Sequence, residues 1–443
     1  MKTPPSNLSH WNGLLDSISA FLRDPQALRL DRISWSGEGV EQRSAYHSLL
    51  QIVRNRTLIE HLIREHSRRM PKARLHALLA LAIIQFLESD DTEATRAKVV
   101  HHSVRLTREL CSQPESRFVN AVARAISEHL SQTLQLLDAP EHWHVRYSHP
   151  RWLVERWISQ FGNKTTRLLL QWNQSIPHTY VHDLRRICQT EQSLRNPEEL
   201  PKLTATPWSD FHVLEKAGRA NIESLLKWPF YIQDPSTRIA PSLFEPPSNR
   251  ASILDTCAAP GGKSLHLLKR LADNGHAWQR WIATDSSPER LRVMENNLER
   301  LGVKGIETSC VDWLKPLPES LASLRFDWVL LDAPCSSVGV IQRHPEIRWR
   351  LHADDYQRLP VQQLALLEQC SRLVRKDGQL VYSTCSFDPD ENERVIEAFQ
   401  QTAQGRHFEV RTGRSLLPHL EGHDGVGAFL LRRKADALSP SGE

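Results

Sequence analysis

The first third of the chain carries apolar residues at the spacing of amphipathic helices. Between Trp11 and Leu137 they recur every three or four positions, as helix faces that pack on a core require. The run Leu75–Leu87 is apolar on nearly all sides and predicts a buried helix, and Phe118–Ile126 predicts another. We find no strong strand pattern in this region, and we therefore expect an all-α domain.

After Arg250 the pattern changes to short apolar runs that alternate with helical segments. Such alternation is typical of a parallel, doubly wound α/β sheet, which binds ligands at the carboxyl ends of its strands. The strands are expected at Ser252–Leu254, Trp281–Thr284, Phe326–Leu331, Gln379–Tyr382 and Ala428–Arg432, and the helices at Ser264–Leu271, Pro288–Leu301, Val361–Leu373 and Glu391–Gln400.

The stretch between these two regions is mixed in character. It predicts helices at Trp152–Phe161 and Thr165–Gln174, and short strands at Thr179–Leu184 and Phe211–Leu214. The expected domains are therefore an all-α domain, a mixed connecting subdomain and an α/β domain, at 1–140, 141–235 and 236–435.

Composition excludes several classes of protein. The chain has 443 residues, of which 40% are hydrophobic, which is enough for two or three domains with cores of their own. Its longest apolar run, around Leu78–Phe86, falls well short of the ~20 residues that a membrane span needs. Met1–His10 is polar and lacks the apolar stretch of a secretory signal. We expect a cytoplasmic protein that makes no membrane contact.

The net charge of +4 is mildly basic, and the positive residues are clumped. A solvated helix face and a contact with nucleic-acid phosphates explain the larger clump equally well. The larger clump comprises Arg54, Arg56, Arg64, Arg68, Arg69, Lys72 and Arg74, and a second one comprises Arg343, Arg348 and Arg350.

The seven cysteines are widely spaced and include no C-x-x-C pair. This pattern favours neither a disulfide framework nor a zinc site, and we expect no bound metal. A lone cysteine is usually a small buried core residue, which we expect of Cys111, Cys188 and Cys370. Cys335 and Cys385 differ because each follows a predicted strand beside polar residues. Both thiols should therefore emerge at the carboxyl edge of the sheet.

The turn after the first predicted strand is rich in small residues. It runs through Thr256–Ser264, and its two glycines would let the backbone approach a ligand closely. The first glycine of a phosphate-binding P-loop is missing, and so is the G-x-G-x-x-G dinucleotide pattern. Taken alone, Gly261-Gly262 is equally well explained as a tight turn.

Acidic residues stand at four successive predicted strand ends, if a further strand is placed before Asp312 as the third of the series. Asp285 lies about 20 residues after the glycine turn, where nucleotide-binding α/β folds place a carboxylate that accepts ribose hydroxyls. A single acid at a strand end is more often a turn or cap residue. Four of them together predict one pocket ringed by Asp255, Asp285, Asp312 and Asp332.

Three segments, in this order and spacing, resemble the signature motifs of the NOL1/NOP2/Sun family of RNA 5-methylcytosine methyltransferases. They are DTCAAPGGKS at 255–264, DAPCSSVG at 332–339 and STCS at 383–386. RHPEIRW at 343–349 and the Gln233-Asp234 pair are similar to further family segments, and the resemblance covers about Trp228 to Arg433. DNA cytosine methyltransferases use the cysteine of the P-C motif as the nucleophile, so the T-C motif favours the RNA family.

This resemblance implies a Rossmann-like class I S-adenosylmethionine methyltransferase domain. It implies that Cys385 attacks C6 of cytosine, which makes C5 reactive toward a methyl group, and that Cys335 assists product release. Asp332 would hold the base edge or lie beside the methyl donor. The implied cofactor contacts come from Cys257, Ala258, Ala259, Pro260, Gly261, Gly262, Lys263, Asp285, Asp312 and Asp332.

The layout of the chain resembles the Sun/RsmB type within this family, the bacterial 16S ribosomal RNA cytosine methyltransferases. Their N-terminal NusB-like domain is similar to the α-rich region here, and Ser148–Leu153 is similar to the segment that opens their central region. The resemblance implies RNA, in particular ribosomal RNA, as the partner, and we expect a monomer. This chain has QDPSTR at 233–238 where family members commonly have QDASAQ, which leaves the RNA target open.

Three other functions remain open on sequence alone. The catalytic motifs are shared with transfer RNA cytosine-5 methyltransferases. A non-catalytic RNA-binding assembly factor built on a NusB-like domain would need neither Cys335 nor Cys385. A methyltransferase of small molecules would explain the acidic residues but not the paired cysteines.

Overall fold

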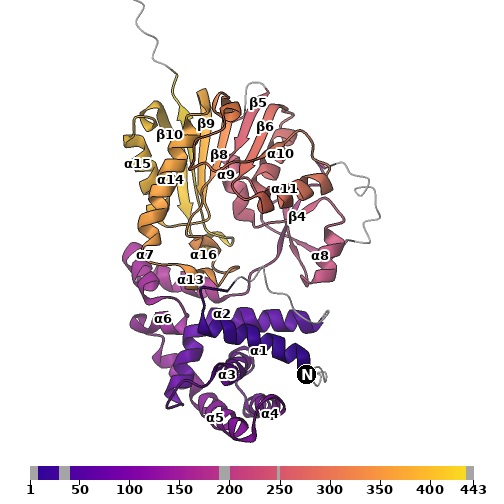
Figure 1. The fold of residues 1–443 in the computed structure, drawn as a ribbon, viewed down its shortest axis with the longest axis vertical. Helices are drawn as coiled ribbons and strands as arrows, with labels where there is room; N and C mark the ends of the chain where they lie inside the picture. The colour runs from indigo at the N-terminus through magenta and orange to yellow at the C-terminus, as the bar shows by residue number, and fades with distance from the viewer. Residues whose placement is uncertain (1–7, 29–39, 189–199, 247–249, 436–443) are drawn as a thin grey trace, which may run out of the picture. The chain divides into compact units, whose positions relative to one another are not determined.

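The fold was analysed in a computed structural model, which describes residues 8–28, 40–188, 200–246 and 250–435. Within these ranges the chain forms two compact units (Figure 1). The helical unit comprises the chain up to Ser175 together with Ile341–Leu351. The sheet unit comprises Ile176–Val340 and the chain from His352 onward. The expected domain limits at 1–140, 141–235 and 236–435 concern independent folding and stay a prediction.

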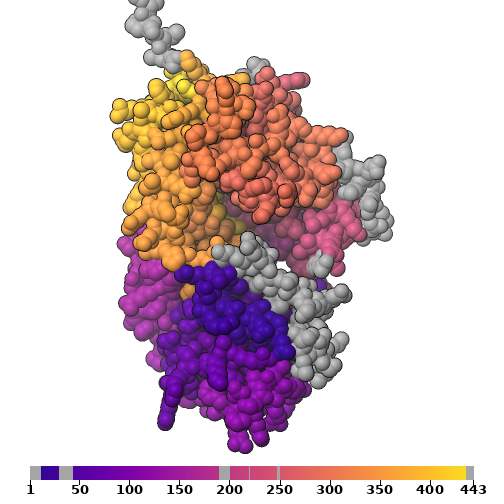
Figure 2. All heavy atoms as spheres, viewed as in Figure 1, coloured from indigo at the N-terminus to yellow at the C-terminus, as the bar shows by residue number. Residues whose placement is uncertain are grey.

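Apolar helix faces build the core of the helical unit. α3 packs against α1, α2, α4 and α5 and is buried over most of its length, which confirms the buried helix expected at Leu75–Leu87. Side chains fill the spaces between these ribbons on the face that Figure 2 shows. The helices are α1 (Leu8–Arg23), α2 (Val40–Glu65), α3 (Ala73–Glu88), α4 (Glu93–Leu110), α5 (Gln113–Leu136), α6 (Trp143–Arg146), α7 (Arg151–Gln174) and α13 (Ile347–Arg350).

The two helices expected at Trp152–Phe161 and Thr165–Gln174 are the two halves of α7. The halves meet at a kink at Gly162, where φ is +74°. Glycine adopts this left-handed conformation readily because it has no Cβ. The helix therefore changes direction where the sequence pattern predicted a break.

The segment Ile341–Leu351 belongs to the helical unit although it lies within the α/β region of the sequence. Its Arg348 is fully buried, and the Trp349 indole donates a hydrogen bond to the Val53 carbonyl at 2.9 Å. A buried guanidinium needs acceptors for its N–H groups. Those of Arg348 are the backbone carbonyls of Arg54, Tyr147, Ser148 and Asn173 at 3.2–3.5 Å.

The two basic clumps of the sequence divide into buried and exposed residues. Arg54 and Arg348 are buried, and Arg54 donates to the Gln342 carbonyl at 2.8 Å. Arg56 forms an ion pair with Glu60 at 2.9 Å. These arginines therefore stabilise the helical unit, which corrects the view of each clump as one surface. The side chains that are exposed belong to Arg64, Arg68, Arg69, Lys72 and Arg350.

The sheet unit begins with a small antiparallel sheet. Within the described residues its strand order is β2-β3-β1-β4, and β1 and β3 are the two strands that the sequence predicts. The strands are β1 (Tyr180–Asp183), β2 (Leu203–Ala205), β3 (Phe211–Leu214) and β4 (Phe230–Ile232), and α8 (Arg219–Leu225) precedes β4.

The large sheet has the order β10-β11-β9-β8-β5-β6-β7 in the described part of the chain. β5 to β9 are parallel to their neighbours, whereas β11 runs antiparallel to β9 and β10. The sequence pattern predicted a parallel sheet, and β11 corrects it to a mixed sheet because it runs antiparallel to both of its neighbours. The strands are β5 (Ala251–Asp255), β6 (Trp278–Asp285), β7 (Glu307–Cys310), β8 (Phe326–Asp332), β9 (Val374–Thr384), β10 (Phe408–Leu416) and β11 (Val426–Arg433).

Helices cover both faces of this sheet, as expected for a doubly wound fold (Figure 1). Alternate strand residues point to opposite faces, so Ile253 packs with α9 and α10 whereas Leu254 packs with α14 and α15. None of the helices in the described ranges is long and apolar enough to cross a membrane. The helices are α9 (Ile239–Leu243), α10 (Gly262–Asp273), α11 (Pro288–Arg300), α12 (Glu319–Ala322), α14 (Asp355–Ser371), α15 (Glu393–Gln401) and α16 (Pro418–Glu421).

Candidate active site

Three neighbouring strand ends meet at one edge of the large sheet. β5, β8 and β9 are adjacent and parallel, and chain order reverses between β5 and β8. Asp332, at the end of β8, pairs in register with Ser383 on β9. This is the switch point where doubly wound sheets bind their ligands, because loops diverge there and leave space.

The small-residue turn after β5 is held tightly by backbone hydrogen bonds. The Thr256 amide donates to Leu330 on β8, and the Ala258 amide donates to Thr284 on β6. Gly261 has φ +105°, which disfavours any residue with a Cβ. A Cβ on Gly262 would come within 2.4 Å of the Gln233 side chain. The glycines are therefore required by this turn itself.

A cavity of about 360 Å³ opens at this edge. It contains both predicted catalytic cysteines and four of the predicted cofactor residues. The other predicted cofactor residues, 258–263, form the turn behind it and do not line it. Its lining includes Cys257, Asp285, Asp312, Asp332, Cys335 and Cys385.

Asp255 is the exception to the predicted ring of four acids. Its side chain is buried beneath α10, lies outside the cavity lining and accepts a hydrogen bond from Ser264 Oγ at 2.7 Å. Burial in this environment raises the pKa of Asp255 to about 7. The expectation that Asp255 faces the pocket is therefore wrong.

Asp285 and Asp312 line the cavity on the side of β6 and β7. The Asp285 carboxylate is only 2% exposed, and its Oδ2 accepts no hydrogen bond from the described residues, although Arg290 lies 3.3 Å away. A buried carboxylate oxygen of this kind is suited to accept hydroxyl hydrogens from a ligand. Asp312 is more open, and a backbone hydrogen bond from Leu314 lowers its pKa.

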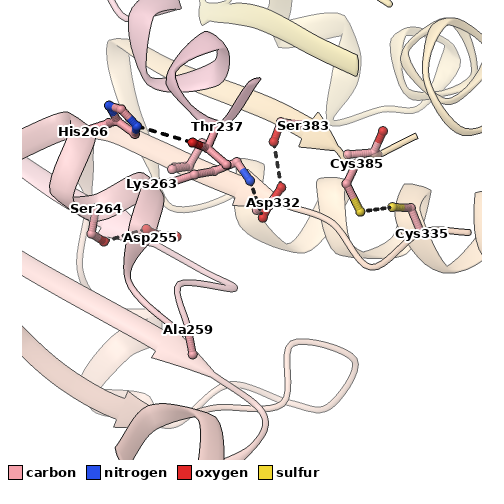
Figure 3. A network of polar contacts seen from close by, with 12 residues as sticks. Thr237, Asp255, Ala259, Lys263, Ser264, His266, Asp332, Cys335, Ser383 and Cys385 are labelled. Carbon is pink, nitrogen blue, oxygen red and sulfur yellow. Dashed lines mark hydrogen bonds and ion pairs between the residues drawn. The ribbon is translucent and has the colours of Figure 1, made fainter. Parts of the chain in front are cut away.

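Asp332 is the centre of a polar network that reaches from α10 to β9 (Figure 3). One carboxylate oxygen accepts from Lys263 Nζ at 2.6 Å, and the other accepts from Ser383 Oγ at 2.8 Å. Burial lowers the pKa of Lys263, but the adjacent Asp332 carboxylate outweighs this and holds the pKa above its usual value. Lys263 therefore stays charged beside the cavity.

The thiols of Cys335 and Cys385 lie 3.3 Å apart, sulfur to sulfur (Figure 3). The Ser337 hydroxyl is 3.3 Å from the Cys385 sulfur. Cys257 lines the same cavity, but burial raises the pKa of its thiol to about 12. Of the seven cysteines, Cys335 and Cys385 thus lie within hydrogen-bond distance of each other as free thiols.

The two paired thiols have opposite pKa shifts. The pKa of Cys385 is lowered, first by the hydrogen bond from Cys335 and then by Ser337 and the Lys263 charge, against the effect of burial. The same hydrogen bond, burial and the nearby Glu391 carboxylate hold the pKa of Cys335 well above its usual range. Although the Asp332 carboxylate opposes it, the hydrogen bonds at the sulfur pair therefore favour a thiolate on Cys385 and a thiol on Cys335.

Sequence reasoning missed several residues of this site. Ser337 and Ser383 contact Cys385 and Asp332, and their place inside the recognised motifs was the only available signal. Glu391 and Asn392 are buried beside both cysteine loops. The pattern placed Glu391 at the start of an ordinary helix, and polar residues are common at that position.

Comparison with known proteins places the chain in a family. Residues 242–425 match the family described as 16S rRNA methyltransferase RsmB/F, and residues 26–128 match the NusB family. Ribosomal RNA small subunit methyltransferase B of Pasteurella multocida is 31% identical, over 81% of this chain and 80% of its own length. The chain belongs to the RsmB/F family. It is an S-adenosylmethionine-dependent rRNA methyltransferase with a NusB-like helical unit.

Other relatives of this RsmB/F-family chain agree over most of its length. A probable ribosomal RNA small subunit methyltransferase B of Bacillus subtilis is 28% identical over 80% of the chain and 81% of that protein. The crystal structure of PH0851 covers 98% of the chain and 100% of its own, with a TM-score of 0.70 and 21% identity. NSun6 from Pyrococcus horikoshii with SFG covers 65% of the chain and 99% of its own, with a TM-score of 0.52 and 19% identity. These structures share the fold.

Membership in this family implies S-adenosylmethionine as the methyl donor, and the cavity is suited to it. The buried Oδ2 of Asp285 has no hydrogen-bond donor among the described residues, so it can accept ribose hydroxyls. The glycine turn and Cys257 lie at the end of β5, where a ligand meets backbone rather than bulky side chains.

Proposed function

We propose that this enzyme transfers a methyl group from S-adenosylmethionine to C5 of a cytosine in 16S ribosomal RNA, through a covalent bond between Cys385 and C6. The relatives are named ribosomal RNA small subunit methyltransferases, which supports the RNA target. The observation that carries the chemistry is the thiol pair, 3.3 Å apart in the cavity that also contains Asp285 and Asp332.

In this proposal the Cys385 thiolate adds to C6 of the ring. The new S–C6 bond breaks the C5–C6 double bond and shifts its electron pair toward C5, which becomes nucleophilic. Bound S-adenosylmethionine would supply an electrophilic methyl group. C5 would bond to this methyl group as the S–CH3 bond breaks and leaves its electron pair on the donor sulfur. The lowered pKa of Cys385 favours the attacking species, because the thiolate rather than the thiol is the nucleophile.

Lys263 and Asp332 orient the base in the same proposal. The exocyclic amine of cytosine is a hydrogen-bond donor, which a carboxylate accepts. Asp332 lies on the cavity wall, where the Lys263 ammonium donates a hydrogen bond to it at 2.6 Å. We therefore assign Asp332 to the base edge.

Cys335 is assigned to product release. Its pKa is raised chiefly by the hydrogen bond to Cys385, and the charge of that thiolate raises it further. Both effects end when Cys385 becomes a neutral thioether, so the pKa of Cys335 falls at that point and loss of its proton to water becomes easier. The resulting thiolate takes the C5 proton, the C5–H electrons re-form the double bond, and the S–C6 bond breaks to release Cys385.

The helical unit is proposed to bind RNA through its exposed cations. Arg64, Arg68, Arg69 and Lys72 are exposed within one short stretch of chain. Neutralising Arg68, Arg69 and Lys72 should flatten the dependence of RNA affinity on salt, because fewer counterions are then released. If the dependence of RNA affinity on salt does not change, these residues do not contact RNA and are ordinary solvent-exposed side chains. Action as a monomer in the cytoplasm stays a prediction.

The proposed function is tested with purified protein, methyl-labelled S-adenosylmethionine and RNA from cells that lack this protein. We expect label in 16S ribosomal RNA and, by bisulfite sequencing, one or a few new 5-methylcytosines there. Label confined to transfer RNA would support the alternative transfer RNA methyltransferase. Label on 16S RNA without a bisulfite-resistant cytosine would contradict the C5 chemistry.

A further inference from the structure

Two adjacent side chains beside the thiol pair have no role in the mechanism above. Glu391 ends the short 3-10 helix Pro389–Glu391, and Asn392 precedes α15. Both are 0% exposed. We propose that they are positioning residues of the reaction, in which Glu391 sets the Cys335 loop and Asn392 sets the Cys385 loop. This inference rests on the proposed function, because it assigns the two loops to release and attack.

Glu391 holds the backbone on both sides of Cys335. Its Oε1 accepts from the Ser336 amide at 2.7 Å, and its Oε2 accepts from the Ser336 hydroxyl. Gln363 of α14 donates both to Glu391 Oε1 at 3.1 Å and to the Pro334 carbonyl at 2.9 Å. Glu391 thus fixes Ser336, after Cys335, directly, and fixes Pro334, before Cys335, through the side-chain amide of Gln363.

Asn392 contacts the residues on both sides of Cys385, a side chain before it and the backbone after it. Its Oδ1 accepts from the Thr384 hydroxyl at 2.7 Å, and its Nδ2 donates to the carbonyls of Ser386 and Asp388 at 2.9 and 3.1 Å. A Cβ on Gly427 of β11 would lie 2.0 Å from Asn392 Oδ1. Glycine at position 427 of β11 therefore leaves space for the Asn392 side chain, and a larger residue there would clash with it.

The cost of this arrangement favours a functional role over a merely structural one. Burial raises the pKa of Glu391 although hydrogen bonds from Ser336, Ser386 and Gln363 oppose it. Buried carboxylates carry a desolvation penalty, and apolar residues of similar volume often stabilise a fold equally well. A carboxylate that fixes a particular backbone amide cannot be replaced in that way.

Glu391 and Asn392 are consecutive residues, so the contacts to the Cys335 loop and to the Cys385 loop share one piece of backbone. Tyr382 OH donates to the Glu391 carbonyl at 2.6 Å, which fixes the shared backbone to β9. The hydroxyls of Ser336 and Ser386, one from each loop, lie 3.4 Å apart. The spacing of the two thiols is therefore set from a single anchor.

The first test separates the two loops by chemistry in the full-length protein without RNA. Alkylation of each thiol by iodoacetamide is followed by mass spectrometry in Glu391→Gln and Asn392→Asp. In Glu391→Gln one of the charges that raise the Cys335 pKa is lost, and we expect Cys335 to react about three- to tenfold faster with Cys385 little changed. In Asn392→Asp the new carboxylate and the lost donors should slow Cys385 by a similar factor. Glu397→Gln on the exposed side of α15 is the matched control and should change neither rate.

The second test follows turnover with 16S RNA. We expect Glu391→Gln to accumulate a covalent protein–RNA adduct, as Cys335→Ala does. Its Cys335 ionises more easily, but the Cys335 loop is no longer held where the thiolate can take the C5 proton. Asn392→Asp should slow adduct formation about 10- to 100-fold. Gln363→Leu and Gly427→Ala disturb the same two anchors and replace either variant if it fails to fold.

Equal changes at both thiols in each variant, tracking a lowered melting temperature, would overturn the assignment. Absence of an adduct in Cys335→Ala would instead contradict the proposed release step. The alkylation pattern decides the positioning roles independently of that result, because it requires neither RNA nor turnover.

Discussion

The Cys335 loop and the Cys385 loop look alike in sequence and differ in electrostatics. Each follows a buried strand, β8 or β9, and each cysteine is followed by serine. Yet the pKa of Cys385 is lowered and that of Cys335 is raised. The hydrogen bond between the two sulfurs is the largest cause of both pKa shifts. Ser337 lowers the pKa of Cys385 further, whereas burial and the Glu391 carboxylate raise that of Cys335.

This contrast teaches that position at a strand end does not determine the role of a thiol. The sheet brings the two sulfurs to 3.3 Å, where one can hydrogen-bond to the other. The direction of that hydrogen bond, with Ser337 beside one sulfur and Glu391 beside the other, then favours the proton on Cys335. The predictions below test this division, beginning with the largest expected effect.

Cys385→Ala removes the proposed nucleophile, and we expect methyl transfer to fall on the order of 10⁴-fold or more. S-adenosylmethionine binding, measured by calorimetry, should stay within about twofold because the Asp285 side of the cavity is intact. Cys111→Ala, in the helical unit, is the matched control. Substantial activity in Cys385→Ala would remove the distinction between the two loops.

Cys335→Ala should slow turnover about 10²- to 10³-fold while leaving the attack intact. The covalent intermediate then persists, so a band of protein linked to RNA should appear on a denaturing gel. The same gel with Cys335→Ala combined with Cys385→Ala should lack the band. A band that survives in the double variant would assign the attack to another residue.

Ser337→Ala removes the hydroxyl that lies 3.3 Å from the Cys385 sulfur. This contact lowers the Cys385 pKa, so its loss should move the rising limb of the pH–rate profile to higher pH by about one unit. Activity should fall most below the wild-type limb and recover at high pH. A loss that is uniform across pH would indicate disturbed geometry rather than a changed pKa.

Asp255→Asn concerns the end of β5, where the buried carboxyl lies outside the cavity lining. Its folded pKa of about 7 exceeds its ordinary value of 3.8, so its ionisation opposes folding: the penalty is absent below about pH 4 and complete above about pH 7. The variant should therefore gain stability over wild type as pH rises from 5 to 8, by a few kcal/mol at most. Urea unfolding at several pH values measures this, with Glu397→Gln as the exposed control. A constant difference between variant and wild type would contradict the shifted pKa.

Much of the fold follows from hydrophobic periodicity in the sequence. The five predicted strands of the large sheet are confirmed because buried strands leave continuous apolar runs. β10 was missed because Phe408–Leu416 is exposed along most of its length, so it carries no such run. The antiparallel direction of β11 was missed for a related reason, since burial patterns do not record strand direction.

The candidate site could be predicted only where motifs carried it. The cysteines and Asp285 were found by strand position and family resemblance, whereas Glu391 and Asn392 were not. Arg348 is an example of the opposite error: it belongs to a basic clump in the sequence, which suggested a surface position, yet it is fully buried. Its acceptors come from helices far away in sequence, and no local pattern reveals such a partnership.

The late segment Ile341–Leu351 also bears on the order of synthesis and on protein engineering. Until residue 351 has been made, the carbonyls that receive Arg348 lack their donor, so the helical unit is completed only after most of the sheet has been synthesised. A chimaera that exchanges the N-terminal 175 residues between relatives would separate this arginine from its own set of carbonyls. If residues 341–351 were exchanged together with them, Arg348 and the carbonyls that accept its hydrogen bonds would come from the same protein.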